Sequence, residues 1–391
     1  MTFNPKDFLS NTVTSIPPSG IRKFFDIAAE MDDVISLGVG EPDFVTPWHI
    51  CNEGVYSLEK GHTHYTPNRG LAELRREISN YMQRRFKLTY DAMTQTIVTV
   101  GGSEAIDIFL RTVLEPGDEV LIPEPSFVCY KPITQLCGGI PVPVLTSAEH
   151  NFKLTPEALS AAITDKTKVL VLPYPNNPTG GIMTREDLEA IAEVLRKHNI
   201  MVLSDEIYSE LTYGRKHVSI AEIYGMYDRT VVVSGFSKAY AMTGWRLGYA
   251  CGHPDIIAQM TKVHQYAIMS APTTAQYAAI EALRKGDNDI ETMRNEYDAR
   301  RKLIVKGFND MGLDCFEPEG AFYAFPSIKS TGLSSNDFCE KLLYDMKVAV
   351  IPGTAFGECG EGHVRCSYAY SVDSITKALD RIETFVKKVK G

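Results

Sequence analysis

The sequence has no hydrophobic run long enough to cross a membrane and no surplus of basic residues. No uninterrupted apolar stretch approaches the roughly 18 to 20 residues that span a bilayer, and the N-terminus has no apolar segment behind a basic start. Against 40 Lys and Arg stand 49 Asp and Glu, a formal net charge of −9. Nucleic acids and anionic membranes are usually bound through excess Lys and Arg. The sequence therefore predicts neither partner and favours small-molecule chemistry.

Disulfide and metal frameworks are missing as well. The eight cysteines are spread along 391 residues without framework spacing, so we expect free thiols in a reducing compartment, the cytoplasm. His62 and His64 alternate as a metal pair does, and Cys359, His363 and Cys366 lie close in sequence. Neither group supplies four ligands at zinc spacing, so the sequence predicts no metal site.

Short apolar runs alternate with amphipathic stretches through most of the chain. Six of these runs are typical of buried strands, namely 96–100, 119–122, 168–172, 200–203, 230–233 and 246–250. Between two of them, Thr184 to Asp187 has a capping-box pattern and opens a stretch of helical periodicity. Repeated alternation of strand and helix predicts an α/β fold, with three α/β/α layers around a mostly parallel sheet and ligands at the carboxyl ends of its strands.

The two ends of the chain differ in character from this middle part. Residues 289–311 form a long charged helical stretch, which precedes short apolar runs and a final helix with one apolar stripe. The first 45 residues have little periodicity. We therefore expect a large domain over residues 46–285, and an N-terminal arm plus a smaller α+β domain built from residues 1–45 and 286–391.

Lys238 is the candidate nucleophile. It follows the expected strand 230–233 among small polar residues, where its amine could form an imine with a carbonyl cofactor. Because an isolated lysine is ordinarily a solvated surface residue, the hypothesis depends on Asp205 and Tyr208, which follow another expected strand. A buried carboxylate keeps a pyridinium nitrogen protonated. If the chain turns into a helix after Asp205, the Tyr208 phenol lies on the same face as that carboxylate. A helix cap is the plain alternative for Asp205.

Three further features are candidate anion sites. Gly101-Gly-Ser-Glu-Ala105 lies at an expected strand-to-helix turn, where backbone N–H groups and the helix dipole can face a phosphate. This segment matches neither the P-loop nor the dinucleotide fingerprint, and a simple tight turn is its alternative. Arg246 and Arg365 lie in apolar strand patterns, and guanidinium groups bind phosphate or carboxylate through two parallel hydrogen bonds. A structural ion pair is the alternative for each.

Four separated motifs together resemble those of the class I aminotransferases of the pyridoxal-phosphate fold type I superfamily. In chain order they are Tyr65-Thr-Pro-Asn-Arg-Gly70, Asn176-Asn-Pro-Thr-Gly180, Ser204-Asp-Glu-Ile-Tyr208 and Ser234-Gly-Phe-Ser-Lys238-Ala-Tyr-Ala-Met-Thr-Gly-Trp-Arg246. The resemblance covers nearly the whole chain. It implies pyridoxal 5′-phosphate as cofactor, an amino acid and a 2-oxo acid as substrates, and transfer in two half-reactions. It also implies a homodimer with active sites at the subunit interface.

The resemblance also implies roles for individual residues. Lys238 resembles the lysine that forms the imine and shuttles the proton, and Asp205 the partner of the pyridine nitrogen. The donors to the ring oxygen would be Asn177 and Tyr208, and the aromatic residue on the ring would be Phe127. The phosphate would be held by Gly102, Ser103, Glu104, Ser234, Ser237 and Arg246, with Tyr65 from the other subunit. The substrate carboxylate would be bound by Arg365 with Gly40 as a backbone donor. Gly235 replaces a serine that some relatives use for phosphate, so the shares of the two neighbouring serines stay open.

Departures from the family pattern predict the substrate. Aspartate-preferring relatives often have a basic residue where this chain has Ser103. Residues 15–25 resemble aromatic and broad-specificity members and would bring Ile16 and Ile21 to the mouth of the site, with Arg22 as the nearby cation. We expect a preference for aromatic or other large L-amino acids with 2-oxoglutarate, and aspartate is the first alternative.

Other activities are alternatives on the same fold. A carbon–sulfur lyase or an aminocyclopropane carboxylate synthase would use nearly the same residues. Outside the enzymes, the alternative is a non-catalytic cofactor-binding effector module, which should carry a helix-turn-helix domain.

Overall fold

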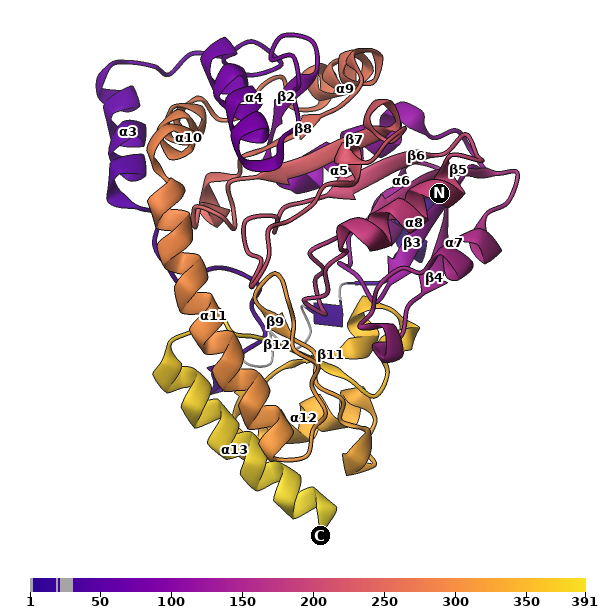
Figure 1. Cartoon of the computed structure of the whole chain (residues 1–391), viewed down its shortest axis with the longest axis vertical. Coiled ribbons are helices and arrows are strands. Elements are labelled where there is room, and N and C mark those ends of the chain that lie inside the picture. Colours follow the sequence, from indigo (N-terminus) through magenta and orange to yellow (C-terminus); the bar gives the residue numbers. More distant parts are fainter. Residues whose placement is uncertain (1–2, 19, 22–30) are drawn as a thin grey trace.

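A seven-stranded sheet forms the centre of the larger part of the molecule in this computed structural model, which describes residues 3–18, 20–21 and 31–391 (Figure 1). The strand order is β2-β8-β7-β6-β5-β3-β4. The strands are β2 (Thr96–Thr99), β3 (Glu119–Glu124), β4 (Ile140–Leu145), β5 (Thr167–Leu172), β6 (Met201–Asp205), β7 (Thr230–Gly235) and β8 (Gly248–Cys251). Strand β8 pairs antiparallel with β2 and β7, and the other neighbours are parallel. The predicted mostly parallel sheet is confirmed.

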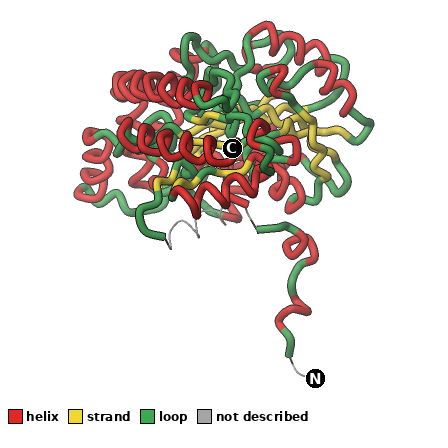
Figure 2. Tube along the Cα trace, turned by 90° about the horizontal axis from the view of Figure 1, so that it is seen from below, coloured by secondary structure: helices red, strands yellow, loops and turns green. Residues whose placement is uncertain are grey.

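Helices cover both faces of this sheet and make three layers (Figure 2). Because successive side chains of a strand point to opposite faces, Val169 and Val171 pack in the core that includes α5 and α9, while Leu170 and Leu172 pack in the core that includes α7 and α8. The helices of this part are α3 (Trp48–Glu59), α4 (Ala72–Phe86), α5 (Gly101–Val113), α6 (Tyr130–Leu136), α7 (Pro156–Ala162), α8 (Arg185–Leu195), α9 (Pro254–Ala267) and α10 (Thr273–Lys285). The predicted capping box at Thr184 and Asp187 opens α8.

Two details of the strand prediction are wrong. Strand β4 was not predicted, because it is an edge strand whose prolines at 141 and 143 interrupt its pattern and whose side chains are mostly not buried. The run 246–250 becomes a strand only from Gly248, because Arg246 has a left-handed backbone with φ of 54°. Arg246 therefore lies in the turn before β8, not within the strand.

A second core includes the long helix α11 (Asp287–Asp310), with α13 (Val372–Lys390) packed on it and α12 (Ser335–Met346) packed on α13. A small antiparallel sheet of β11 (Ile351–Pro352), β12 (Val364–Ser367) and β9 (Tyr323–Ala324) completes this core. Strand β1 (Ile35–Ser36) pairs with β10 (Val348–Ala349), so residues from near both ends of the chain meet here. The boundaries at residues 46 and 286 stay a prediction.

The first described residues project from the body of the molecule (Figure 2). They include the short helices η1 (Pro5–Phe8) and α1 (Asn11–Ser15), neither of which has a buried residue. Within the described ranges, no helix is both long and apolar enough to cross a membrane.

Candidate active site

A pocket of about 360 Å³ lies between the carboxyl ends of the parallel strands and the second core. Parallel strands that end at one edge bring their following loops together there, which is why residues distant in sequence meet. The predicted site residues that line it are Ile21, Gly40, Gly102, Ser103, Phe127, Asn177, Asp205, Tyr208, Ser237, Lys238, Arg246 and Arg365. The described residues contain no group of His, Cys, Asp and Glu arranged to hold a metal ion.

Lys238 follows β7, and its amine reaches across to the segment before α3. Its Nζ donates to Gly40 O at 2.6 Å and lies 5.8 Å and 5.7 Å from the ring centroids of Tyr208 and Phe322. Burial lowers the pKa of Lys238 to about 8. An amine with such a pKa is partly neutral near physiological pH, as a nucleophile or a base must be.

Asp205 ends β6 as a buried carboxylate. The Tyr130 hydroxyl donates to its Oδ2 at 2.7 Å, and the Ile207 backbone N–H donates to Oδ1 at 3.2 Å. Burial raises the pKa of Asp205, and the two donors oppose that shift. A cation beside this carboxylate would favour its charged form. Tyr130 was not among the predicted site residues, because no local sequence pattern links it to Asp205, 75 positions away.

Tyr208 lies in a turn and not in a helix, and it lines the same pocket as Asp205. The turn is closed by hydrogen bonds from Ser209 N to Glu206 O at 3.0 Å and from Leu211 N to Tyr208 O at 2.9 Å. The Tyr208 and Tyr323 hydroxyl oxygens are 2.8 Å apart. Tyr323 also lines the pocket and was missed, because its sequence context indicated only a buried strand.

The N-terminus of α5 and Arg246 form one end of the pocket. Gly101 begins α5 with φ of +74°, and a Cβ there would lie 2.8 Å from an Arg246 guanidinium nitrogen. Glycine is therefore needed for this close approach. Ser103 and Ser237 line the same pocket. A helix N-terminus, a guanidinium group and two hydroxyls are suited to binding an anion such as phosphate.

Arg365 is a buried cation with no acidic partner among the described residues. It lies in β12 and is 2% exposed, and its Nη1 donates to Asn177 Oδ1 at 2.9 Å. Its Nη2 donates to Gly38 O, and its guanidinium carbon lies 4.7 Å from the ring centroid of Tyr323. Within residues 3–18, 20–21 and 31–391, Nε has no hydrogen-bond partner. A structural ion pair is therefore wrong for Arg365 within the described chain, and an anionic ligand would satisfy it.

Four predicted site residues do not line the pocket, and a fifth, Arg22, lies outside the described residues. Glu104 is turned away, because its carboxylate accepts from Val100 N and is 2.5 Å from His264 Nδ1. Ser234 donates to Glu206 O at 3.3 Å. The other two are Tyr65, which is 82% exposed, and Ile16, which is half-buried.

Comparisons with known proteins agree with this arrangement. The family model for aminotransferase class I and II matches residues 32–382. The chain is 54% identical to a putative aminotransferase, YugH, of Bacillus subtilis, over 97% of this chain and 99% of the relative. It is 46% identical to an aspartate aminotransferase of Pyrococcus abyssi, over 98% and 99%.

A solved structure gives the same result at the level of the fold. The aromatic aminotransferase from Pyrococcus horikoshii OT3 superposes with a TM-score of 0.90 at 44% identity, over 94% of this chain and 99% of that one. The chain therefore belongs to the class I and II aminotransferases, pyridoxal-phosphate-dependent enzymes of fold type I.

Proposed function

We propose that this aminotransferase prefers aromatic or other large L-amino acids as donors and uses 2-oxoglutarate as acceptor. The supporting observation is that the described pocket lining has no spare cation for a second carboxylate. Its basic residues are Lys238, Arg246 and Arg365, and each has a proposed role in cofactor or α-carboxylate binding. Ile21, Val39 and other apolar side chains line the pocket.

This lining favours an apolar substrate side chain on energetic grounds. Removing apolar surface from water contributes roughly 25 cal/mol per Å², whereas burying a carboxylate without a partner is penalised. Since 2-oxoglutarate has a distal carboxylate, Arg22 or another residue near the mouth must pair with it in the second half-reaction. Aspartate is the alternative donor, and the similarity to an aspartate aminotransferase keeps it open.

The substrate preference can be tested by comparing kcat/KM for phenylalanine, tyrosine, alanine and aspartate with 2-oxoglutarate. We expect the aromatic donors to lead aspartate by about tenfold or more, some 1.4 kcal/mol of transition-state preference. An aspartate lead of that size would contradict the proposal. Product analysis without an oxo acid is the control for a carbon–sulfur lyase, which would still release product.

The pocket residues fit pyridoxal phosphate. An anion-binding end at α5, a buried carboxylate and a lysine of lowered pKa are lining groups of one pocket. The buried Arg365 Nε without a partner indicates that a further anion belongs beside it. When bound, the cofactor supplies an electron sink that stabilises negative charge at the substrate Cα.

The roles follow from this fit. The phosphate would be held by the N-terminus of α5 with Gly102, Ser103, Ser237 and Arg246. Asp205 would be the partner of the ring nitrogen, Phe127 the aromatic residue on the ring, and Asn177 and Tyr208 the donors to the ring oxygen. Arg365 binds the substrate α-carboxylate beside Gly40. Lys238 Nζ takes the proton from the substrate Cα in one half-reaction and returns a proton to Cα in the other.

Arg365→Lys tests the α-carboxylate role. Lysine keeps the charge but loses the two parallel hydrogen bonds, so we expect KM to rise about ten- to a hundredfold for every amino acid alike. Steady-state kinetics with aromatic, aliphatic and acidic donors measure this. The control is Arg381→Lys, whose guanidinium bonds Asp33 far from the pocket lining. An effect restricted to acidic donors would mean that Arg365 binds the side chain instead.

We also propose a homodimer with shared active sites in the cytoplasm. Trp48, Tyr65 and Tyr266 are 74%, 82% and 85% exposed, and exposed apolar patches of this kind mark interaction sites. The Tyr65 and Tyr266 segments adjoin, because Asn68 Nδ2 donates to Met269 O at 2.8 Å. Covered by a second copy, Tyr65 would reach the partner's phosphate. Light scattering would give the oligomeric state.

The cellular compartment is a separate proposal. The eight free cysteines support a reducing compartment such as the cytoplasm.

A further inference from the structure

The turn after β6 carries functional side chains but is not regular secondary structure. Within residues 206–211, the Tyr208 hydroxyl faces Tyr323 at the pocket, and the Glu210 carboxylate faces α4 on the other side. Only the two backbone hydrogen bonds of this turn, from Ser209 and Leu211, hold it from within. Backbone hydrogen bonds from Glu206 N to Val233 O and from Ala321 N to Leu211 O, both at 2.8 Å, hold its two ends, and side-chain contacts position the residues between them.

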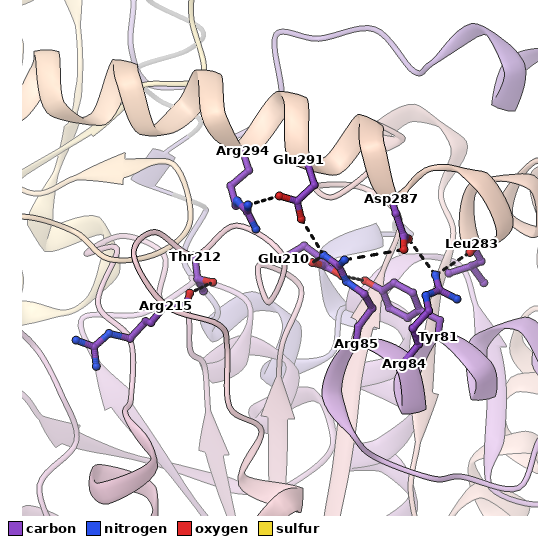
Figure 3. Close-up of polar contacts among 10 residues, drawn as sticks. All are labelled: Tyr81, Arg84, Arg85, Glu210, Thr212, Arg215, Leu283, Asp287, Glu291 and Arg294. Atoms are coloured by element: carbon purple, nitrogen blue, oxygen red, sulfur yellow. Dashed lines mark hydrogen bonds and ion pairs between the residues drawn. The ribbon is translucent and has the colours of Figure 1, made fainter.

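Glu210 is bound by two residues one turn apart on α4 (Figure 3). Arg85 donates from Nε to Oε1 at 2.8 Å and from Nη2 to Oε2 at 2.5 Å. The Tyr81 hydroxyl donates to Oε1 at 2.5 Å. Glu210 is 6% exposed. A buried, two-pronged, charge-assisted contact of this kind holds its partners in one geometry.

Arg85 also contacts the start of α11, as Figure 3 shows. Its Nη2 lies 3.4 Å from Glu291 Oε1, and its Nη1 lies 3.9 Å from Asp287 Oδ2. Arg84 and Arg294 pair with these same two carboxylates. We name this group of three arginines (Arg84, Arg85, Arg294) and three carboxylates (Glu210, Asp287, Glu291) the α4 cluster. Its charges balance, so neutralising Glu210 leaves a cation without its buried partner.

The same helix α11 reaches Tyr208 by a second route. The Tyr208 ring packs edge-on against Phe322 with centroids 5.4 Å apart, and Phe322 lies 5.5 Å from Tyr297 of α11. Tyr208 is therefore fixed through its own ring and through Glu210, two residues further along the turn. Loss of the second attachment loosens the middle of the turn, while the ring contact and the backbone hydrogen bonds at its two ends remain.

We propose that Arg85 and Glu210 are positioning residues of the transamination reaction. Their ion pair fixes the turn 206–211, so that the Tyr208 hydroxyl keeps its place in the pocket. This inference rests on the proposed role of Tyr208 as a donor to the cofactor ring oxygen. Arg85 and Glu210 themselves do not line the pocket and touch no reacting atom.

The test is a double-mutant cycle between Glu210→Gln and Tyr208→Phe in the holoenzyme. We expect Glu210→Gln to lower kcat about tenfold with KM within about twofold, and to lose this effect in the Tyr208→Phe background. Arg85→Lys, which keeps the charge, serves if the glutamine variant folds poorly. The matched control is Glu77→Gln, because Glu77 lies on the same helix and accepts from Arg284 Nε and Nη2 at 2.9 Å and 2.7 Å.

A second readout needs no cofactor. Backbone hydrogen exchange of the peptide covering 206–211 in the cofactor-free protein should be faster in Glu210→Gln than in the parent, and unchanged in Glu77→Gln. The inference is overturned if the Glu210→Gln and Arg85→Lys variants keep the parent kcat, or if the loss is the same with and without the Tyr208 hydroxyl. If Tyr208→Phe alone leaves kcat unchanged, the proposed role of Tyr208 fails, and the inference with it.

Discussion

Replacing Lys238 by alanine is expected to lower the rate of transamination at least about 10⁴-fold, because the variant loses both the nucleophile and the base. Lys238 is the only lysine among the described residues that line the pocket. Its neighbours include Asp205, Tyr208 and Arg246, whose side chains cannot form an imine. We expect the variant to fold, because the substitution removes one hydrogen bond, from Lys238 Nζ to the Gly40 carbonyl.

Borohydride reduction followed by peptide mapping measures the covalent bond directly. In the parent enzyme the reduced pyridoxyl group should be found on Lys238, and in Lys238→Ala on no lysine. Lys131→Ala is a suitable control, because Lys131 lies on α6 and pairs with Glu124 outside the pocket. A label on another lysine of the parent would reject Lys238 as the nucleophile.

The lowered pKa of Lys238 also has a consequence for stability. In the cofactor-free protein the pKa of Lys238 is about 8 in the folded state, against 10.5 for a lysine in the unfolded chain. Between pH 8 and pH 10.5 the unfolded chain therefore binds more protons than the folded protein. The free energy of unfolding contributed by this group therefore rises with pH across that window and is lowest below pH 8. We expect the free energy of unfolding of Lys238→Met to exceed that of the parent most at pH 7. This difference should shrink by about 3 kcal/mol toward pH 10.5. Urea unfolding at both pH values checks this.

The sheet could be predicted where burial gives a continuous signal. Strands β5, β6 and β7 are covered by helices on both faces, so they read as uninterrupted apolar runs. The edge strand β4 has one neighbour, alternates proline with valine over residues 141–144 and has one buried side chain, so no such run marks it. The capping box of α8 was readable because its contacts span only three residues.

The site residues were predictable where a motif follows a strand, since topology brings strand ends together. Tyr130 and Tyr323 contact Asp205 and Tyr208 across 75 and 115 residues, and no local pattern reports such a contact. Glu104 shows the same limit. Its phosphate role through the backbone stays a prediction, but its carboxylate lies against His264, 160 residues away, and no local pattern reports that contact.

Asp205→Asn is expected to lower kcat about 10²- to 10³-fold, the second large effect. A buried charge that loses its counter-charge costs about 3 to 5 kcal/mol, and an amide cannot hold a ring nitrogen protonated. Tyr130→Phe provides a graded comparison. It removes one hydrogen bond to the carboxylate but keeps the charge, so about a tenfold loss is expected.

The stability of the cofactor-free Asp205→Asn variant separates a chemical role from a structural one. Burial raises the pKa of Asp205, which means that the charged form is less favourable in the folded protein than in the unfolded chain. Above that pKa the carboxylate therefore lowers the free energy of unfolding, and asparagine relieves this cost. We expect the variant to be at least as stable as the parent at pH 7 in urea, yet nearly inactive. Turnover close to the parent's would remove Asp205 from the reaction, whereas loss of both stability and activity would make it a structural residue.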